Sequence, residues 1–355
     1  PLASLRRFEI RDAKLVLQDH ILRGAWTIDS FNAILTRAKD GVQADIEMQL
    51  PNQKDREGRF FASLTLDEDD KEISFKARMD SFTPAYLAQQ SKRLMWLKDQ
   101  EATLYFESEG VLDFELNPKK IGAVLRSPEG KMLIDGLSEN PLQYKDFFVG
   151  LSYQHENRTL SVDEASLTFT KDFQGKDHSL TFNAGAKALI TDSGLDGSVE
   201  VSIDKAAQET VGLFWPKALE DENAKEWIVD KMSGGFFHDV SASLNFQTRP
   251  TDEGWDILTS DEMAYFSVDR MDLDYKEPLL PLRDAKGSGW FDNNQEKLVI
   301  EVESGTIGSL SVGRSHLEFV EVMAVGRGIA DLNINLSGPL GGVLEYIERD
   351  PINFK

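Results

Sequence analysis

The chain lacks cysteine, paired histidines and long apolar runs, and each absence removes a class of function. With no cysteine in 355 residues, disulfides, thiolate metal sites and cysteine nucleophiles are excluded. The apolar runs are only a few residues long, whereas a membrane-spanning helix needs about 20 apolar residues. The five histidines are scattered, without the spacing of a zinc site: His20, His155, His178, His238 and His316.

Short catalytic motifs are missing as well. The chain contains neither the Gly-x-Ser-x-Gly motif of serine hydrolases nor a Gly-Lys-Ser/Thr phosphate loop. The acidic run Asp67–Asp70 lies between two strand-like patterns, so we interpret it as a solvated hairpin turn rather than a calcium site. The sequence therefore predicts a protein that is not an enzyme and has no catalytic residue, metal or cofactor.

Basic residues are scarce relative to acidic ones. The 61 acidic and 39 basic residues give a net charge of −22, which repels phosphate backbones at long range. We therefore expect no nucleic-acid partner. The apolar content of 41% is that of a chain that folds.

Apolar and polar residues alternate with period two along most of the chain, which predicts half-buried β-strands. Turn residues separate the strands, so we expect an antiparallel meander of roughly twenty strands, too wide to remain flat. The clearest predicted strands are 42–50, 73–79, 112–116, 180–184, 199–203 and 298–302, with turns at 40–41, 128–130 and 192–194.

Three segments have helical spacing instead: 84–98, 205–231 with a break at Pro216, and 339–348. We expect Phe214, Trp215 and Trp227 of the second segment to pack against the sheet. The helices recur after strand-rich stretches, which predicts three strand blocks within one continuous elongated body: 1–100, 101–235 and 236–355.

Several stretches resemble one known family. Gly212-Leu-Phe-Trp-Pro-Lys-Ala-Leu219, followed by Trp227-Ile-Val229 and Gly234-Gly-Phe-Phe-His-Asp-Val240, is similar to the central signature of the AsmA-like superfamily of YhdP/TamB type. Three further stretches agree with that family: the opening phrase 5–19, the segment 82–88, and the closing strand, glycine turn and helix at 334–347. The resemblance covers nearly the whole chain through loose patterns of glycine, aromatic and apolar positions.

This resemblance implies a fold and a function. The fold is mainly β, a long curled antiparallel meander that forms an open apolar groove (a β-taco) with a few short helices. The function is a periplasmic module that holds phospholipid acyl chains and contributes to phospholipid transfer between the inner and outer membranes. Full-length relatives are anchored in the inner membrane by a terminal helix that is missing here. Other envelope proteins are further expected partners.

Twelve apolar residues on the predicted strands are the candidates for lining the groove. They are Ile46, Met48, Leu64, Ile73, Phe75, Met79, Phe106, Phe114, Leu116, Phe182, Val201 and Ile300.

Three alternatives remain open at this stage. The apolar faces could pack on another sheet as an ordinary sandwich core. The chain could instead be a scaffold or chaperone-like module that assists outer-membrane protein assembly through edge-strand pairing. A glycan-active or adhesive sandwich would need clustered exposed aromatics or paired carboxylates, and the sequence offers no convincing pair.

Overall fold

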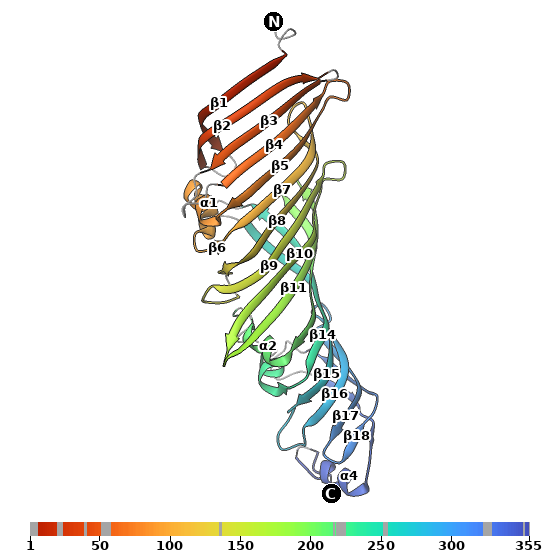
Figure 1. Ribbon diagram of the computed structural model, residues 1–355. Coiled ribbons are helices and arrows are strands. Elements are labelled where there is room, and N and C mark those ends of the chain that lie inside the picture. Colours follow the sequence, from red (N-terminus) through yellow and green to blue (C-terminus); the bar gives the residue numbers. More distant parts are fainter. Residues whose placement is uncertain are drawn as a thin grey trace. The chain divides into compact units, whose positions relative to one another are not determined.

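The computed structural model is one open antiparallel sheet of 21 strands with a few short helices (Figure 1). It describes residues 6–19, 24–38, 41–50, 58–134, 137–215, 217, 225–250, 255–321, 329–350 and 352–354. The predicted fold class, an open and mainly β meander with few helices, is confirmed.

The strands follow one another along the chain, joined largely by short turns. The first nine are β1 (Arg7–Asp19), β2 (Gly24–Ala38), β3 (Gly41–Leu50), β4 (Gly58–Asp67), β5 (Glu72–Phe82), β6 (Glu101–Ala102), β7 (Leu104–Asp113), β8 (Pro118–Met132) and β9 (Leu142–Gln154). The next six are β10 (Thr159–Phe173), β11 (Lys176–Thr191), β12 (Gly194–Ala207), β13 (Met232–Ser233), β14 (Phe236–Pro250) and β15 (Trp255–Leu273). The last six are β16 (Leu282–Asp292), β17 (Lys297–Ile307), β18 (Leu310–Val312), β19 (Ser315–Val320), β20 (Ile329–Asn333) and β21 (Leu336–Ser337).

Five helical segments interrupt the meander in the part of the chain that the structure describes: α1 (Pro84–Gln90), the 3-10 helix η2 (Lys92–Leu97), α2 (Gln208–Leu213), the π-helix η4 (Glu226–Lys231) and α4 (Leu340–Ile347). They lie within the three predicted helical segments and are shorter than predicted. No described helix is long and apolar enough to cross a bilayer.

The chain divides into two compact units. Unit 1 comprises 1–134, 140–171 and 185–195, and unit 2 comprises 135–139, 172–184 and 196–355. The three predicted strand blocks stay a prediction.

Aspartates in a left-handed conformation interrupt several strands. Six described non-glycine residues within strands have positive φ, and five of them are aspartates: Asp12, Asp146, Asp239, Asp261, Arg270 and Asp284. Asp and Asn tolerate this conformation better than other side chains. Most of these positions coincide with shifts in strand register, which mark β-bulges. Because a bulge bends and twists its strand, the aspartates are the local cause of sheet curvature.

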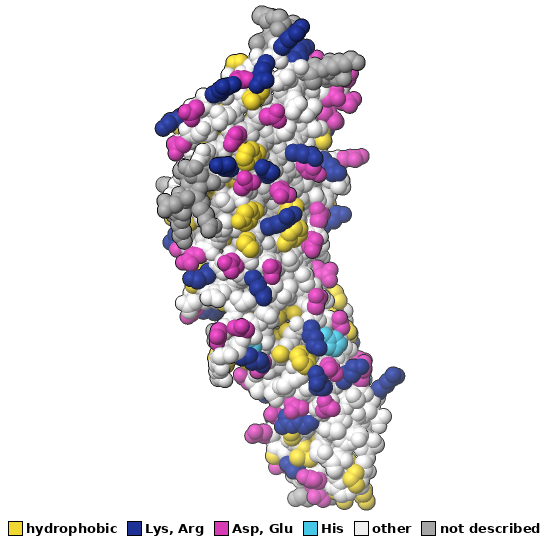
Figure 2. Space-filling view, viewed as in Figure 1, with side chains coloured by type: hydrophobic (Ala, Val, Ile, Leu, Met, Phe, Trp, Pro, Cys, Tyr) yellow, Lys and Arg dark blue, Asp and Glu magenta, His cyan; other side chains and the backbone are white. Residues whose placement is uncertain are grey.

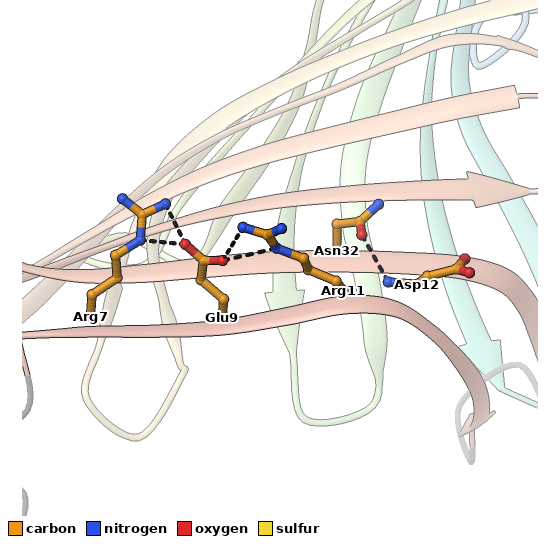
Figure 3. A network of polar contacts seen from close by, with 5 residues as sticks. All are labelled: Arg7, Glu9, Arg11, Asp12 and Asn32. Carbon is orange, nitrogen blue, oxygen red and sulfur yellow. Dashed lines mark hydrogen bonds and ion pairs between the residues drawn. The ribbon is translucent and has the colours of Figure 1, made fainter.

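The first bulge shows how the neighbouring strand supports such a residue (Figure 3). The backbone N–H of Asp12 donates to Asn32 Oδ1 across the β1–β2 pair at 2.9 Å. On β1, Glu9 lies between Arg7 and Arg11 and binds both guanidinium groups. These hydrogen bonds lower the pKa of the Glu9 carboxyl, and the bond from Arg11 has the larger effect.

Two sequence predictions about turns need correction. The segment 128–130 is not a turn but part of β8, because Pro128 lies where β8 passes from pairing with β7 to pairing with β6. A proline is tolerated where the ladder needs no N–H. Conversely, Phe114 and Leu116 are not in a strand. Asp113 accepts the N–H groups of Glu115 and Asn117 and so closes the β7–β8 turn around them.

Two other predicted turns are confirmed. Residues 192–193 form the β11–β12 turn. The acidic run at 67–70 is the β4–β5 hairpin turn, in which Asp67 Oδ1 accepts the N–H groups of Asp69 and Asp70. The predicted turn at 40–41 falls partly outside the described residues.

Unit 2 holds two buried apolar clusters, each closed by helices. In the first, Tyr346, Val343 and Ile347 of α4 pack against Leu310 and the strands beside it. In the second, Val211 of α2 and Ile228 of η4 join a group centred on Phe237, Met271 and Ala285. Helices thus cover part of the sheet in this unit.

Candidate functional site

The register of unit 1 collects apolar side chains into three rows across seven strands, which we call the apolar face. Residues directly opposite each other on neighbouring strands lie on the same side of a sheet. Row one is Phe31, Met48, Phe60, Met79, Phe106, Leu125 and Val149. Row two is Ala33, Ile46, Ala62, Ala77, Ser108, Ala123 and Leu151. Row three is Leu35, Ala44, Leu64, Phe75, Gly110, Ile121 and Tyr153.

The side chains of row two are shorter than those of rows one and three. Five of its seven members are alanine or serine, whereas most members of the outer rows are large. The one hydroxyl in the row is satisfied internally, because Ser108 Oγ donates to the Gly122 carbonyl at 2.9 Å. The apolar face is therefore a shallow channel that crosses the strands, with a floor of small residues and two apolar walls. Ile46 and Leu151 interrupt the floor, so its small residues are continuous only from Ala62 to Ala123 over four strands. Seven strands at about 4.8 Å spacing give the whole apolar face a length of roughly 29 Å.

Among the described residues, no close backbone contact brings a second layer against most of this face. The strands β3, β4 and β7 make their main contacts with their neighbours in the sheet. Most side chains of the apolar face are accordingly half-buried, although Ala33 and Ala44 are buried.

The structure brings together seven of the twelve candidate groove residues in unit 1. Six lie in the three rows: Ile46, Met48, Leu64, Phe75, Met79 and Phe106. Ile73 lies beside row three and is buried. Phe114 and Leu116 lie apart in the β7–β8 turn, 47% and 64% exposed.

The three remaining candidates belong to unit 2. Val201 on β12 and Ile300 on β17 lie on one face by register, through β14, β15 and β16. Phe266 of that face packs against the cluster that Val211 of α2 and Ile228 of η4 join. Phe182 is half-buried on β11. In unit 2 this face is therefore partly covered by helices, unlike the apolar face of unit 1.

The three aromatic residues of the second predicted helical segment differ in how exposed they are. Phe214 is buried and Trp215 half-buried, as packing against the protein interior requires. Trp227 is more exposed than these two, at 39%, and the Lys231 ammonium lies 4.6 Å from its ring centroid.

The opposite face of unit 1 carries a hollow of about 860 Å³, which we call the polar trough. Its lining comes from two rows that alternate with the apolar face, together with Asp163 and six members of row two: Ile46, Ala62, Ala77, Ser108, Ala123 and Leu151. The first row is Ile34, Asp45, Ser63, Lys76, Glu109, Gly122 and Ser152, and the second is Asn32, Glu47, Phe61, Arg78, Glu107, Val124 and Gly150. The large residues Leu64, Phe75 and Phe106 do not line it.

Charges of both signs line the polar trough. Lys76 Nζ lies 3.6 Å from Glu109 Oε2, and the Arg78 guanidinium lies 4.7 Å above the ring of Phe61. Figure 2 shows the same mixture on the surface turned to the viewer, where basic and acidic side chains alternate with small apolar groups. Sequence reasoning missed this trough, because it depends on which side chains the register places opposite one another.

Metal and cofactor chemistry receives no positive support from the part of the chain that the structure describes. No three or more His, Asp or Glu side chains there are placed to hold a metal ion. The main candidate site is therefore the apolar face, whose chemistry is the burial of hydrocarbon. Comparison with family models, with curated proteins and with solved structures gives no match to this chain.

Proposed function

We propose that the apolar face of unit 1 binds the acyl chains of a phospholipid or another diacyl lipid. One observation carries this proposal: a continuous apolar surface of three rows crosses seven strands without a second layer over most of it. Soluble proteins rarely leave contiguous apolar surface of this kind free, and such surface marks a binding site.

The physical chemistry of the face suits a flexible hydrocarbon chain. Each methylene removed from water contributes about 0.8 kcal/mol, so an acyl chain gains ample free energy without any polar anchor. One leaflet of a bilayer is about 15 Å of hydrocarbon, and the apolar face of roughly 29 Å is longer than that. Because four neighbouring members of the floor are alanine or serine, a chain can occupy neighbouring positions of similar energy there. A lipid could then slide along the face.

The resemblance stated above suggests where such a module acts. On that basis we propose a periplasmic module, anchored to the inner membrane in the full-length protein, that contributes to phospholipid transfer between membranes. An ordinary core is the competing interpretation of the apolar face, and it requires a covering layer.

The first experiment is native mass spectrometry with lipid extraction, on protein purified without detergent. Uptake of a fluorescent fatty acid is then compared in two variants that add the same ring to opposite faces. Ala77→Phe fills the floor of the apolar face, and Ser63→Phe adds a ring to the polar trough. We expect Ala77→Phe to lose uptake and Ser63→Phe to retain it. Equal uptake by both, or none by the wild type, contradicts the proposal.

A second candidate function rests on β1. This strand of 13 residues lies at the N-terminal end of the sheet (Figure 1) and exposes Phe8, Val16 and Leu17. A strand of this length can pair with an extended segment of another protein, as a scaffold for outer-membrane protein assembly requires. Crosslinking from position 16 to an envelope protein in cells, without bound lipid in the purified chain, would favour this function.

A further inference from the structure

The segment formed by α1 and η2 is fixed at one end of the strands of unit 1. It joins the end of β5 to the starts of β6 and β7, and Figure 1 shows α1 beside those strand ends. Row one is the row of the apolar face nearest to this end, since its member Met79 precedes the end of β5 by three residues. The α1–η2 segment therefore lies at the rim of the proposed lipid-binding face.

Three buried residues attach the segment to the sheet. Tyr86 is 6% exposed, and its hydroxyl faces the Thr27 carbonyl of β2 at 3.5 Å. Ser91 is buried and bridges to Gly24 at the start of β2. Gln100 is also buried and pairs with the backbone of Leu133, donating to its carbonyl at 2.8 Å and accepting its N–H at 3.0 Å. The segment is thus held in place by specific contacts.

Despite this attachment, η2 presents two large apolar side chains to solvent. Trp96 is 68% exposed and Met95 is 48% exposed. Residues 92–98 include three basic residues and no acidic one in a chain of net charge −22, and Asp99, which follows directly, lies 3.8 Å from Lys98 Nζ. An exposed tryptophan beside basic residues is the composition that settles at the headgroup level of a bilayer.

We propose that η2 is the site at which this protein contacts a lipid bilayer, with Met95 and Trp96 entering the interface. Residues 92–99 hold three basic residues and one acidic residue, so by sequence this segment repels lipid phosphates less than the rest of the chain. The inference rests on the proposed function, because a bilayer contact at the rim of the apolar face gives acyl chains a short path onto row one.

The test uses the full chain and vesicles of phosphatidylcholine, with and without phosphatidylglycerol. Co-sedimentation is compared for the wild type, for the double variant Met95→Ser/Trp96→Ser, and for Trp227→Ser as a matched exposed tryptophan of unit 2. Thermal unfolding of each variant confirms that it is folded. We expect the double variant to bind vesicles roughly tenfold more weakly or worse, since a tryptophan can bury 150–250 Å² of apolar surface. Trp227→Ser should bind like the wild type.

Brominated phosphatidylcholine gives a second measurement, since bromine within the bilayer quenches a tryptophan that enters it. The wild type should lose part of its emission, and Trp96→Phe should lose less. Unchanged vesicle binding by the double variant, or equal quenching in Trp96→Phe, overturns the inference.

Uptake of a fluorescent fatty acid from solution separates this inference from the proposed function. Wild-type protein that takes up the fatty acid but ignores vesicles of both compositions refutes the bilayer contact alone. Protein that does neither refutes the proposed function as well.

Discussion

Asp284 holds a backbone conformation that few residues adopt in the middle of a strand. Its φ is 51°, and its N–H donates to Asp272 Oδ1 at 2.9 Å. Valine, branched at Cβ, is strained there by about 1–2 kcal/mol, whereas glycine is not. We therefore expect Asp284→Val to lower the free energy of unfolding by that amount and Asp284→Gly to change it little. Urea unfolding measures both variants, and equal stability of the two would show that the bulge does not require a left-handed residue.

His316 adds a pH-dependent interaction across two strands. Its Nδ1 lies 2.6 Å from Glu301 Oε1, and this hydrogen bond is the largest cause that raises the pKa of His316 above its ordinary 6.5. Because the folded-state pKa is the higher one, the contribution is complete below the unfolded pKa and disappears as pH rises through the folded value. The stability difference between wild type and His316→Gln should therefore shrink as pH rises from about 5.5 to about 8.

Urea unfolding at several pH values measures that difference, with Glu301→Gln as the control that removes the partner. A difference that grows with pH would mean that the imidazole is not stabilised in its charged form.

At the scale of elements, α4 offers two adjacent glycines with opposite expected responses. A Cβ at Gly341 meets nothing within 4 Å, whereas one at Gly342 comes within 2.2 Å of Ser309 Oγ and 3.1 Å of Leu310 Cδ2. Alanine in place of glycine at an open helical position stabilises the folded state by about 0.5–1 kcal/mol. We expect Gly341→Ala to raise the melting temperature and Gly342→Ala to lower it, because α4 must move away from Leu310. The same sign for both would mean that α4 does not dock as closely as described.

Elements are also the scale at which the sequence is most informative. Alternation in Val42–Leu50 and Ile73–Met79 predicts strands with one apolar side, because both sides of a strand are distinguishable in a single sequence. The segment 128–130 shows the limit. Its Pro and Gly indicate a turn, yet the strand continues, because Gly130 admits the Tyr144 hydroxyl, which a Cβ would meet at 2.6 Å. That contact is long-range and leaves no local signal.

The candidate site could be predicted only in part for the same reason. Six residues of its three rows follow from alternation. The low middle row does not, because it depends on Ala62, Ala77 and Ala123 lying opposite one another, which the bulges and turn lengths determine. The polar trough on the other face depends on register in the same way.

For the whole molecule, the balance between buried and exposed apolar surface decides its behaviour in water. An apolar face that the chain itself does not cover is covered by a ligand or a second copy, or it stays exposed to water. Exposure to water is unfavourable by about 25 cal/mol for each Å² of apolar surface. Lipid that binds the apolar face as proposed would also stabilise the folded state, because it would bind only to that state.

Removal of bound lipid should therefore change the state of the protein in solution. After extraction by a hydrophobic resin, we expect concentration-dependent association in sedimentation velocity and increased fluorescence of an apolar dye. Adding a long-chain fatty acid should restore the monomer and raise the melting temperature, since the acid and a second copy compete for the apolar face. Ala77→Phe should respond less to the acid than Ser63→Phe. An extracted protein that stays monomeric, binds no dye and gains no stability from fatty acid has an apolar face closed to ligands, as an ordinary core would be.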